Sequence, residues 1–295
     1  MKKILYEETM DGLVIERIRR DHDFSMPTKH FHNEYEIYYL VQGERYYFIN
    51  NDTYLCTSGC LVLIEHNLVH KTSTSTDPCH DRILVELREE LLESLIAQLG
   101  ITVQEFFHTY TGIYQLNKAT QDRIEKLFKN IATEIHNKSV HYELLVKMKL
   151  MELFIFIQRY QRNTPASQNQ ITPRNEKHEL VDRVAKYITA HYKLNESLDD
   201  IAKKFYVNKC YLSRIFSEVT GFTISEYINI NRIKEAKHLL SSSEFSLTEI
   251  ALQLGFRSTA YFVRVFKIYT ETTPHQYRKQ LQSYKEQRRR QKKEG

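Results

Sequence analysis

"SLTEIALQLGFRSTAYFVRVFKIYTETTPHQYR", residues 246–278, is the stretch that decides the fold. It opens with Ser-x-x-Glu, a pattern in which the serine hydroxyl accepts a hydrogen bond from a helical N–H and the glutamate reaches back to the serine N–H. Gly255 supplies the left-handed backbone that a tight turn often needs. Ser258 is then a natural cap for a second helix. The stretch therefore predicts two short helices joined by a tight turn.

The same unit occurs earlier in the chain, as "SLDDIAKKFYVNKCYLSRIFSEVTGFTISEYI" at residues 197–228. Arg214 of this copy matches Arg264 of the later copy, which has one extra residue in its turn. Two copies predict two equivalent binding surfaces, because a repeat array that stacks into a solenoid needs at least three. A helix over 223–240, opened by another capping pattern, is expected to hold the two units apart.

The second helix of each unit carries the functional prediction. Its apolar residues fall on one side, which leaves a face of small and polar side chains around one arginine. A short helix, a tight turn and such a second helix describe a helix-turn-helix, whose second helix enters the major groove of DNA. An arginine can make two hydrogen bonds to guanine there. The residues predicted to contact DNA are Asn208, Lys209, Cys210, Ser213, Arg214, Ser258, Thr259, Ala260, Val263 and Arg264.

The net charge of +5 is distributed unevenly along the chain. Residues 174–295 hold 23 Lys and Arg against 14 Asp and Glu, whereas the preceding residues hold 19 against 23. A basic half beside an acidic half predicts that the second half meets a polyanion, although a merely solvated basic surface would have the same composition. The terminal "KEQRRRQKKEG" is expected to attract phosphates without reading sequence.

The first half of the chain has a different pattern. Residues 1–87 contain β-branched and aromatic runs cut by turn residues, which predicts a small antiparallel barrel or sandwich. Helical spacing then takes over, and helices predicted over 117–137 and 139–160 would form an antiparallel hairpin. The excess apolar face of this hairpin would cover either the barrel or a second copy of the chain. "NTPASQNQITPRNE", residues 163–176, is polar with two prolines and is the predicted linker.

A second candidate site lies in "KHFHNEYEIYYLVQG", residues 29–43. His30, His32 and Glu36 share one face of a strand because side chains alternate. His70 could arrive from a later strand, as in the metal-binding cupins that this stretch resembles. Imidazoles and a carboxylate suit a transition metal, but they equally hydrogen-bond the hydroxyls of a sugar on which tyrosines stack. A sensing pocket without metal, cofactor or catalytic residue is the preferred prediction. Its predicted ligand-binding residues are His30, His32, Glu36, Tyr38 and His70.

Residues 178–280 resemble the DNA-binding domain of the AraC family of bacterial transcription regulators. The motifs that carry the resemblance are "IALQLGF", "YFVRVFK" and "TPHQYR", with the weaker first copy upstream. One departure is Glu271, where the family usually has glycine, whereas Gly221 keeps it in the first copy. The first half resembles, more loosely, the cupin-like sensory domain of the same family, although Glu65 and Asn67 replace a usual proline and glycine.

The predicted fold class is α+β. An N-terminal antiparallel β-barrel of the cupin-like kind, with a helical hairpin, precedes an all-α domain with two helix-turn-helix motifs. The predicted parts are a ligand-sensing and dimerisation domain at 1–162, the linker at 163–176, the DNA-binding domain at 177–284 and a basic tail at 285–295.

The resemblance implies a sequence-specific transcription regulator rather than an enzyme. It favours an activator that acts with RNA polymerase on promoter DNA as a homodimer and responds to a small molecule that is a sugar or carbohydrate-related. "MKKILYEETMDG" has no apolar stretch behind its lysines and the longest apolar run is far too short to span a bilayer, so a cytoplasmic protein without a membrane partner is expected. The alternatives left open are a metal-dependent cupin enzyme or metal sensor fused to a DNA-binding domain, and a constitutive DNA-binding protein with a ligand-free barrel.

Overall fold

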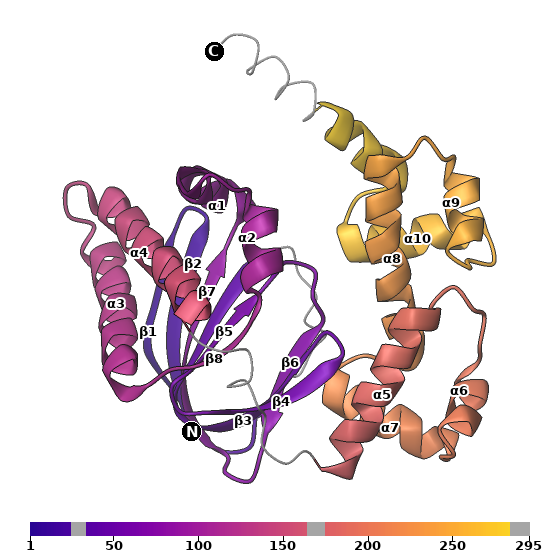
Figure 1. The fold of residues 1–295 in the computed structure, drawn as a ribbon, viewed down its shortest axis with the longest axis horizontal. Helices are drawn as coiled ribbons and strands as arrows, with labels where there is room; N and C mark the ends of the chain where they lie inside the picture. The colour runs from indigo at the N-terminus through magenta and orange to yellow at the C-terminus, as the bar shows by residue number, and fades with distance from the viewer. Residues whose placement is uncertain (25–33, 164–174, 284–295) are drawn as a thin grey trace. The chain divides into compact units, whose positions relative to one another are not determined.

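The computed structural model describes residues 1–24, 34–163 and 175–283 of the chain (Figure 1). Its internal contacts divide it into two units, Met1–Asn175 and Glu176–Gly295. Apart from its edges, the predicted linker lies outside the described residues, as does the predicted basic tail at 285–295.

The strands of the first unit pair in antiparallel fashion around one long strand, β3 (Tyr35–Ile49). The first part of β3 pairs with β7 and β5, and its second part pairs with β4 and β6, so β3 belongs to two sheets. The other strands are β1 (Lys2–Met10), β2 (Leu13–Asp21), β4 (Asp52–Thr57), β5 (Cys60–Ile64), β6 (His70–Thr74), β7 (Cys79–Leu87) and β8 (Gly112–Gln115). The predicted antiparallel sheet domain is therefore confirmed.

A bulge and a glycine bend β3 where it passes from one sheet to the other. The register with β7 shifts between Leu40 and Gln42, and the next residue, Gly43, has φ +104°. A Cβ at this position would lie 2.4 Å from the carbonyl oxygen of Cys79. Only glycine tolerates both the positive φ and this close approach, which allows the two sheets to share one strand.

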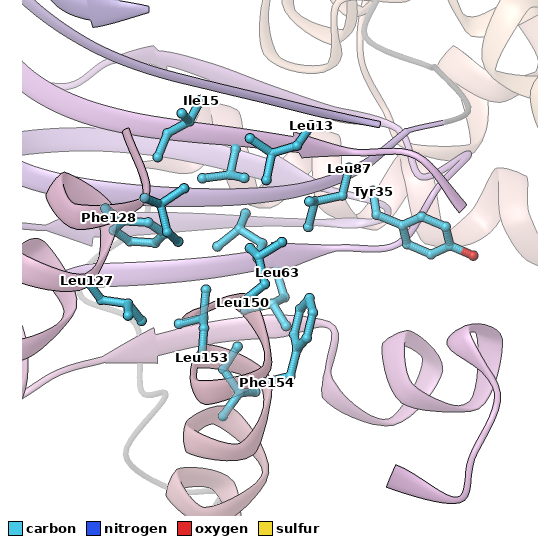
Figure 2. Packing of buried hydrophobic residues seen from close by; sticks show 14 of the residues in the cluster. Leu13, Ile15, Tyr35, Leu63, Leu87, Leu127, Phe128, Leu150, Leu153 and Phe154 are labelled. Carbon is cyan, nitrogen blue, oxygen red and sulfur yellow. The ribbon is translucent and has the colours of Figure 1, made fainter. Parts of the chain in front are cut away.

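Strand residues alternate between the two sides of the sheet, so the apolar residues of one side form a continuous face. Helices cover this face. The helices of this unit are α1 (Glu89–Ile96), α2 (Val103–Tyr110), α3 (Lys118–Asn137) and α4 (Tyr142–Asn163). Figure 2 shows Leu13, Ile15 and Leu87 of the strands packed with Phe128 of α3 and Phe154 of α4 in one core. The predicted α3–α4 hairpin is present, whereas α2 and β8 were not predicted from the sequence.

The opposite face of the strands, called here the inner face, has a second cluster of buried residues. Tyr38 and Leu40 lie on it, while their neighbours Ile37 and Tyr39 belong to the core under the helices. The cluster consists of Tyr38, Leu40, Tyr47, Ile49, Cys56, Cys60, Val62 and Ile64.

The second unit is helical in all of its described elements, as predicted. Its helices are α5 (Glu176–His191), α6 (Leu198–Lys204), α7 (Lys209–Thr220), α8 (Ile224–Ser242), α9 (Leu247–Gln253) and α10 (Thr259–Thr270), and residues 274–283 are also helical. Complete capping boxes open α6, α8 and α9 at Ser197, Thr223 and Ser246. The two predicted helix-turn-helix units are α6–α7 and α9–α10.

Glu271 takes the left-handed conformation that Gly221 takes in the first unit. Its φ is +61° against +83° for Gly221, and in each case the backbone N–H closes the preceding helix, by bonding to the carbonyls of Lys267 and Ser217 respectively. The departure from the usual glycine therefore leaves the turn geometry intact and adds backbone strain of about 1 kcal/mol.

The substitution Glu271→Gly is therefore expected to raise the free energy of unfolding by about 1 kcal/mol. The glutamate side chain is exposed, so its removal costs little packing. Urea unfolding monitored by circular dichroism measures the change, and Gly221→Ala serves as the reverse control, with an expected loss of similar size. A loss of stability in Glu271→Gly would show that the side chain, not the backbone, matters at this position.

Candidate functional site

The second helix of each helix-turn-helix is held by a cap and by a buried side. The Asn208 side chain accepts a hydrogen bond from the N–H of Cys210 at 2.8 Å, and the Ser258 hydroxyl accepts one from Tyr261 at 3.2 Å. The side chains predicted to point inward are all buried: Leu212, Ile215, Phe216, Phe262, Val265 and Phe266. The opposite side of α7 and α10 therefore faces away from the core.

An exposed arginine stands at the same position of both helices. The Arg214 guanidinium lies 5.8 Å from the ring centre of Tyr211, and the Arg264 guanidinium lies 5.2 Å from that of Tyr261. Residues three apart share a helix face, and the attraction of a cation to an aromatic ring orients each arginine along that face. The two tyrosines were not among the predicted DNA-binding residues, although the repeated Tyr-x-x-Arg was visible in the sequence.

Some of the remaining predicted DNA-binding residues are bonded to other groups of the protein, and the others have small side chains. Asn208 and Ser258 are exposed, but their side-chain oxygens are engaged as helix caps. Thr259 donates its hydroxyl to that of Thr248 at 3.3 Å, and Lys209 lies 3.8 Å from Asp199. The residues with small or uncommitted side chains beside the arginines are Cys210, Ser213, Ala260 and Val263. This combination leaves room for a helix to approach base edges with its arginine foremost.

In the first unit, Glu36 and His70 meet on the inner face, as predicted. The two side chains are 2% and 1% exposed, and His70 Nε2 lies 3.1 Å from the Glu36 carboxylate. His70 Nδ1 lies 2.9 Å from the carbonyl oxygen of Leu68, while the Tyr47 hydroxyl donates to Glu36 at 2.9 Å. Burial, and then the Glu36 charge, raise the pKa of Tyr47 well above its ordinary value, so its hydroxyl stays a donor.

Of the other predicted ligand-binding residues, the structure describes Tyr38 but not His30 and His32. Tyr38 is buried on the inner face, and its ring meets that of Tyr47 edge-on at 5.1 Å. His30 and His32 lie outside the described residues. Within the described ranges, no group of three or more His, Cys, Asp or Glu side chains is placed to hold a metal ion.

Three arginines, two of them buried and one partly buried, also occupy the inner face, and sequence reasoning missed them. Arg20 and Arg82 come from β2 and β7, and Arg45 comes from the second part of β3. Burial, and then the neighbouring charge of Arg82, lower the pKa of Arg20 to about 10. His80 sits opposite Arg20 in the strand register, and burial together with Arg45 lowers its pKa to about 4, so it is neutral at pH 7. The alternation of Glu16, Ile18 and Arg20 along one strand was the available signal.

Comparison with known proteins gives two family matches. Residues 12–154 match the model of the AraC-like ligand binding domain, and residues 201–280 match a helix-turn-helix domain. The two matches do not overlap and together span most of the chain. No described helix is long and apolar enough to cross a membrane.

Individual relatives agree with these matches. An uncharacterized HTH-type transcriptional regulator of Staphylococcus aureus (strain MSSA476) is 26% identical over 258 residues, which are 86% of this chain and 32% of the relative. The chain thus spans about a third of the length of the first curated relatives it matches. The melibiose operon regulatory protein of Escherichia coli (strain K12) is 26% identical over 263 residues, 86% of this chain and 84% of that protein. Among solved structures, apo ToxT from Vibrio cholerae has 19% identity and a TM-score of 0.41, over 94% of this chain and 100% of that one.

Proposed function

Because the chain belongs to the AraC family of transcription regulators, we propose that it binds promoter DNA through both helix-turn-helix units and changes the transcription of nearby genes when a small molecule binds its N-terminal domain. The observation that carries the proposal is the repeated pair of exposed arginines, each oriented by a tyrosine on the outer side of a capped helix. Two such helices in one chain can read two stretches of major groove.

The charge of the second half supports DNA as its partner. Residues 174–295 carry an excess of nine positive charges over negative ones, and an excess of this kind attracts the phosphate backbone before any base is read. Binding is therefore expected to weaken as salt concentration rises.

The effector is proposed to bind on the inner face of the N-terminal sheet, where Glu36, Tyr38, Tyr47 and His70 gather. Hydroxyl, imidazole and carboxylate groups beside tyrosine rings suit a carbohydrate-related molecule. The similarity to a regulator of a melibiose operon points in the same direction. An activator that works with RNA polymerase in the cytoplasm is the proposed mode of action.

A homodimer is proposed to form through the α3–α4 hairpin. One side of α4 packs in the core, but Val140, Leu144 and Met148 on or just before it are 82%, 58% and 60% exposed. Met148, together with Met151 and Phe156, also lines a shallow hollow against α3. Apolar residues exposed in a row along one helix suit a partner helix better than water.

The substitution Met148→Glu is expected to shift the full chain from dimer to monomer, because it places a charge in the proposed apolar contact. Sedimentation velocity at matched protein concentrations measures the shift. Lys126→Glu, which places a glutamate at an exposed position of α3 and changes the charge by two units rather than one, is the control and should stay dimeric. If both variants keep the wild-type mass, this hairpin is not the interface.

The proposed function is tested by mapping the sites that the chain occupies in cells and by measuring expression of the adjacent genes. Enrichment at a common sequence upstream of genes whose expression changes when the chain is deleted is the expected result. Occupancy without a shared sequence, or with no change in expression, would contradict it.

A further inference from the structure

The inner face holds three arginines that are only partly matched by hydrogen-bond acceptors. Arg20, Arg45 and Arg82 are here called the arginine cluster, and Arg45 is 0% and Arg20 5% exposed. Glu16 accepts a hydrogen bond from Arg82 at 2.6 Å, and the negative charge of Asp23 acts on Arg45. The nearby carboxylate of Asp81 points to the opposite side of β7, where it pairs with Arg17 and Arg19 at 2.9 and 2.8 Å.

Strand register brings the cluster together with Tyr38. Arg82 lies opposite Leu40 of β3 and Ile18 of β2, so Tyr38 and Arg20 are each one diagonal step away from it on the same face. Such diagonal neighbours are within reach of long side chains. Burial raises the pKa of Tyr38, and the positive charges of Arg82 and Arg45 oppose that rise, which places the phenol in the field of both arginines.

Several donors in this cluster have no hydrogen-bond partner within the part of the chain that the structure describes. They are Arg20 Nη1, Arg45 Nε, Arg82 Nη1 and the Tyr38 hydroxyl, all fully buried. The other bonds of Arg45 go to neutral oxygens, the hydroxyl of Thr74 and the carbonyl of Phe24. The guanidinium of Arg20 lies 3.8 Å from the ring centre of Phe24, which supplies no counter-charge.

Buried donors and buried charges without partners cost free energy, and proteins retain them where they serve binding. Guanidinium groups match carboxylate and phosphate oxygens with two parallel hydrogen bonds, and a phenol adds a third donor. A neutral sugar offers no paired anionic oxygens to the unpartnered guanidinium nitrogens of the cluster. From this arrangement we infer that the effector is a small anion, carrying a carboxylate or phosphate group that Arg20, Arg45, Arg82 and Tyr38 hold. The inference rests on the proposed function, because it names the chemical class of the molecule that the inner face binds.

The test uses the full chain and two minimal probes, inorganic phosphate and acetate, each compared with chloride at equal ionic strength. Binding is followed by calorimetry and by hydrogen exchange of the amides in β2, β3 and β7. At least one probe is expected to bind and to slow exchange in these strands. The probe with the larger effect distinguishes a phosphate from a carboxylate ligand.

Matched variants assign the response to the cluster. Arg20→Met keeps the long side chain without its charge, and Tyr38→Phe deletes only the hydroxyl. Both are expected to weaken anion binding at least fivefold, and both should leave the anion-free chain as stable as the wild type or more so, because each removes an unpartnered buried group. Arg19→Gln, on the next residue and the opposite face, should bind like the wild type. The Arg214→Ala/Arg264→Ala double variant should also respond, which excludes anions held by the DNA-binding unit.

Loss of the response in Arg20→Met and its weakening in Tyr38→Phe, with both controls intact, would support the inference. A response retained in Tyr38→Phe and Arg20→Met, or absent from the wild type, would overturn it; if Arg20→Met fails to fold, Tyr38→Phe decides. Specific DNA binding without any anion response refutes this inference and leaves the proposed regulator standing. An anion response without specific DNA binding refutes the proposed function alone.

Discussion

Replacing Gly255 by alanine is expected to lower the free energy of unfolding of the C-terminal unit by roughly 3 kcal/mol or more. Gly255 has φ +79°, and a Cβ there would lie 2.2 Å from the carbonyl oxygen of Lys193 and 2.9 Å from its carbonyl carbon. Backbone atoms cannot move aside as a flexible side chain can. The Lys193 region is also tied to α8, because Arg232 donates hydrogen bonds to the carbonyls of Tyr192 and Leu194 at 2.7 and 3.2 Å.

A matched glycine separates the clash from the backbone strain. Gly100 has φ +75° with no atom within 4 Å of its would-be Cβ, so Gly100→Ala should cost its own unit only about 1 kcal/mol. Hydrogen exchange measured by mass spectrometry reports each unit separately. Equal losses at the two glycines would show that the contact with Lys193 does not limit stability. The prediction further requires that Gly255→Ala weakens DNA binding only in proportion to the fraction of this unit that is unfolded.

Replacing Arg214 or Arg264 by alanine is expected to cost about 1–3 kcal/mol of binding free energy on the specific DNA site and to relax sequence preference there. Each guanidinium is exposed and oriented by a tyrosine three residues earlier, so it can reach two acceptors of a guanine at once. Fluorescence anisotropy with specific and scrambled duplexes at several salt concentrations measures both effects.

Two control substitutions define the role of each arginine. Arg264→Lys keeps the charge but lacks the planar fork, so it should retain the affinity for scrambled DNA and lose discrimination. Tyr261→Phe keeps the ring under Arg264 and loses only the hydroxyl that accepts from Asn229 at 3.2 Å, and it should bind nearly as the wild type. If the alanine variants weaken specific and scrambled duplexes alike, the arginines contact phosphates and the base-reading role is wrong.

The local features of the DNA-binding unit could be predicted because they depend on neighbouring residues. Ser197, Thr223 and Ser246 each precede an acid by three residues, and each forms the expected capping box. The same logic applied to Thr102 and Glu105 would have located α2, whose capping box is equally complete. By contrast, β8 has four residues and exists because β5 offers it a partner, which no local pattern reveals.

Positions where a residue other than glycine takes the left-handed backbone conformation were harder to predict. Tyr206 occupies the turn position that Gly255 occupies in the second unit, with φ +56° and a side chain that is 96% exposed. Nothing packs around it to forbid a side chain, so the turn depends on the helices on either side rather than on the residue within it. Sequence alone shows a tyrosine where a glycine is expected and cannot show that the space is open.

The inner face was predicted only in part for a related reason. Alternation placed Glu36 and Tyr38 on one side of a strand, and the resemblance to cupins, not alternation, suggested that His70 would lie beside Glu36. The arginine cluster obeys the same alternation, but charged residues are ordinarily assigned to the solvent side of a sheet. Which side is closed depends on how β3 joins two sheets, and that pairing is set by residues far apart in the chain.

Strand β3 also connects the proposed effector site directly to the helices that pack on the other face of the sheet. Tyr38 faces the arginine cluster, while the hydroxyl of the next residue, Tyr39, donates to Glu125 of α3 at 3.2 Å and its ring packs against Phe128. A planar peptide group joins the two tyrosines and fixes the distance between their Cα atoms, so a displacement of the backbone at Tyr38 also displaces Tyr39. A displacement of β3 at Tyr38 would therefore act on the contacts of Tyr39 with α3 through one strand, without an intervening loop.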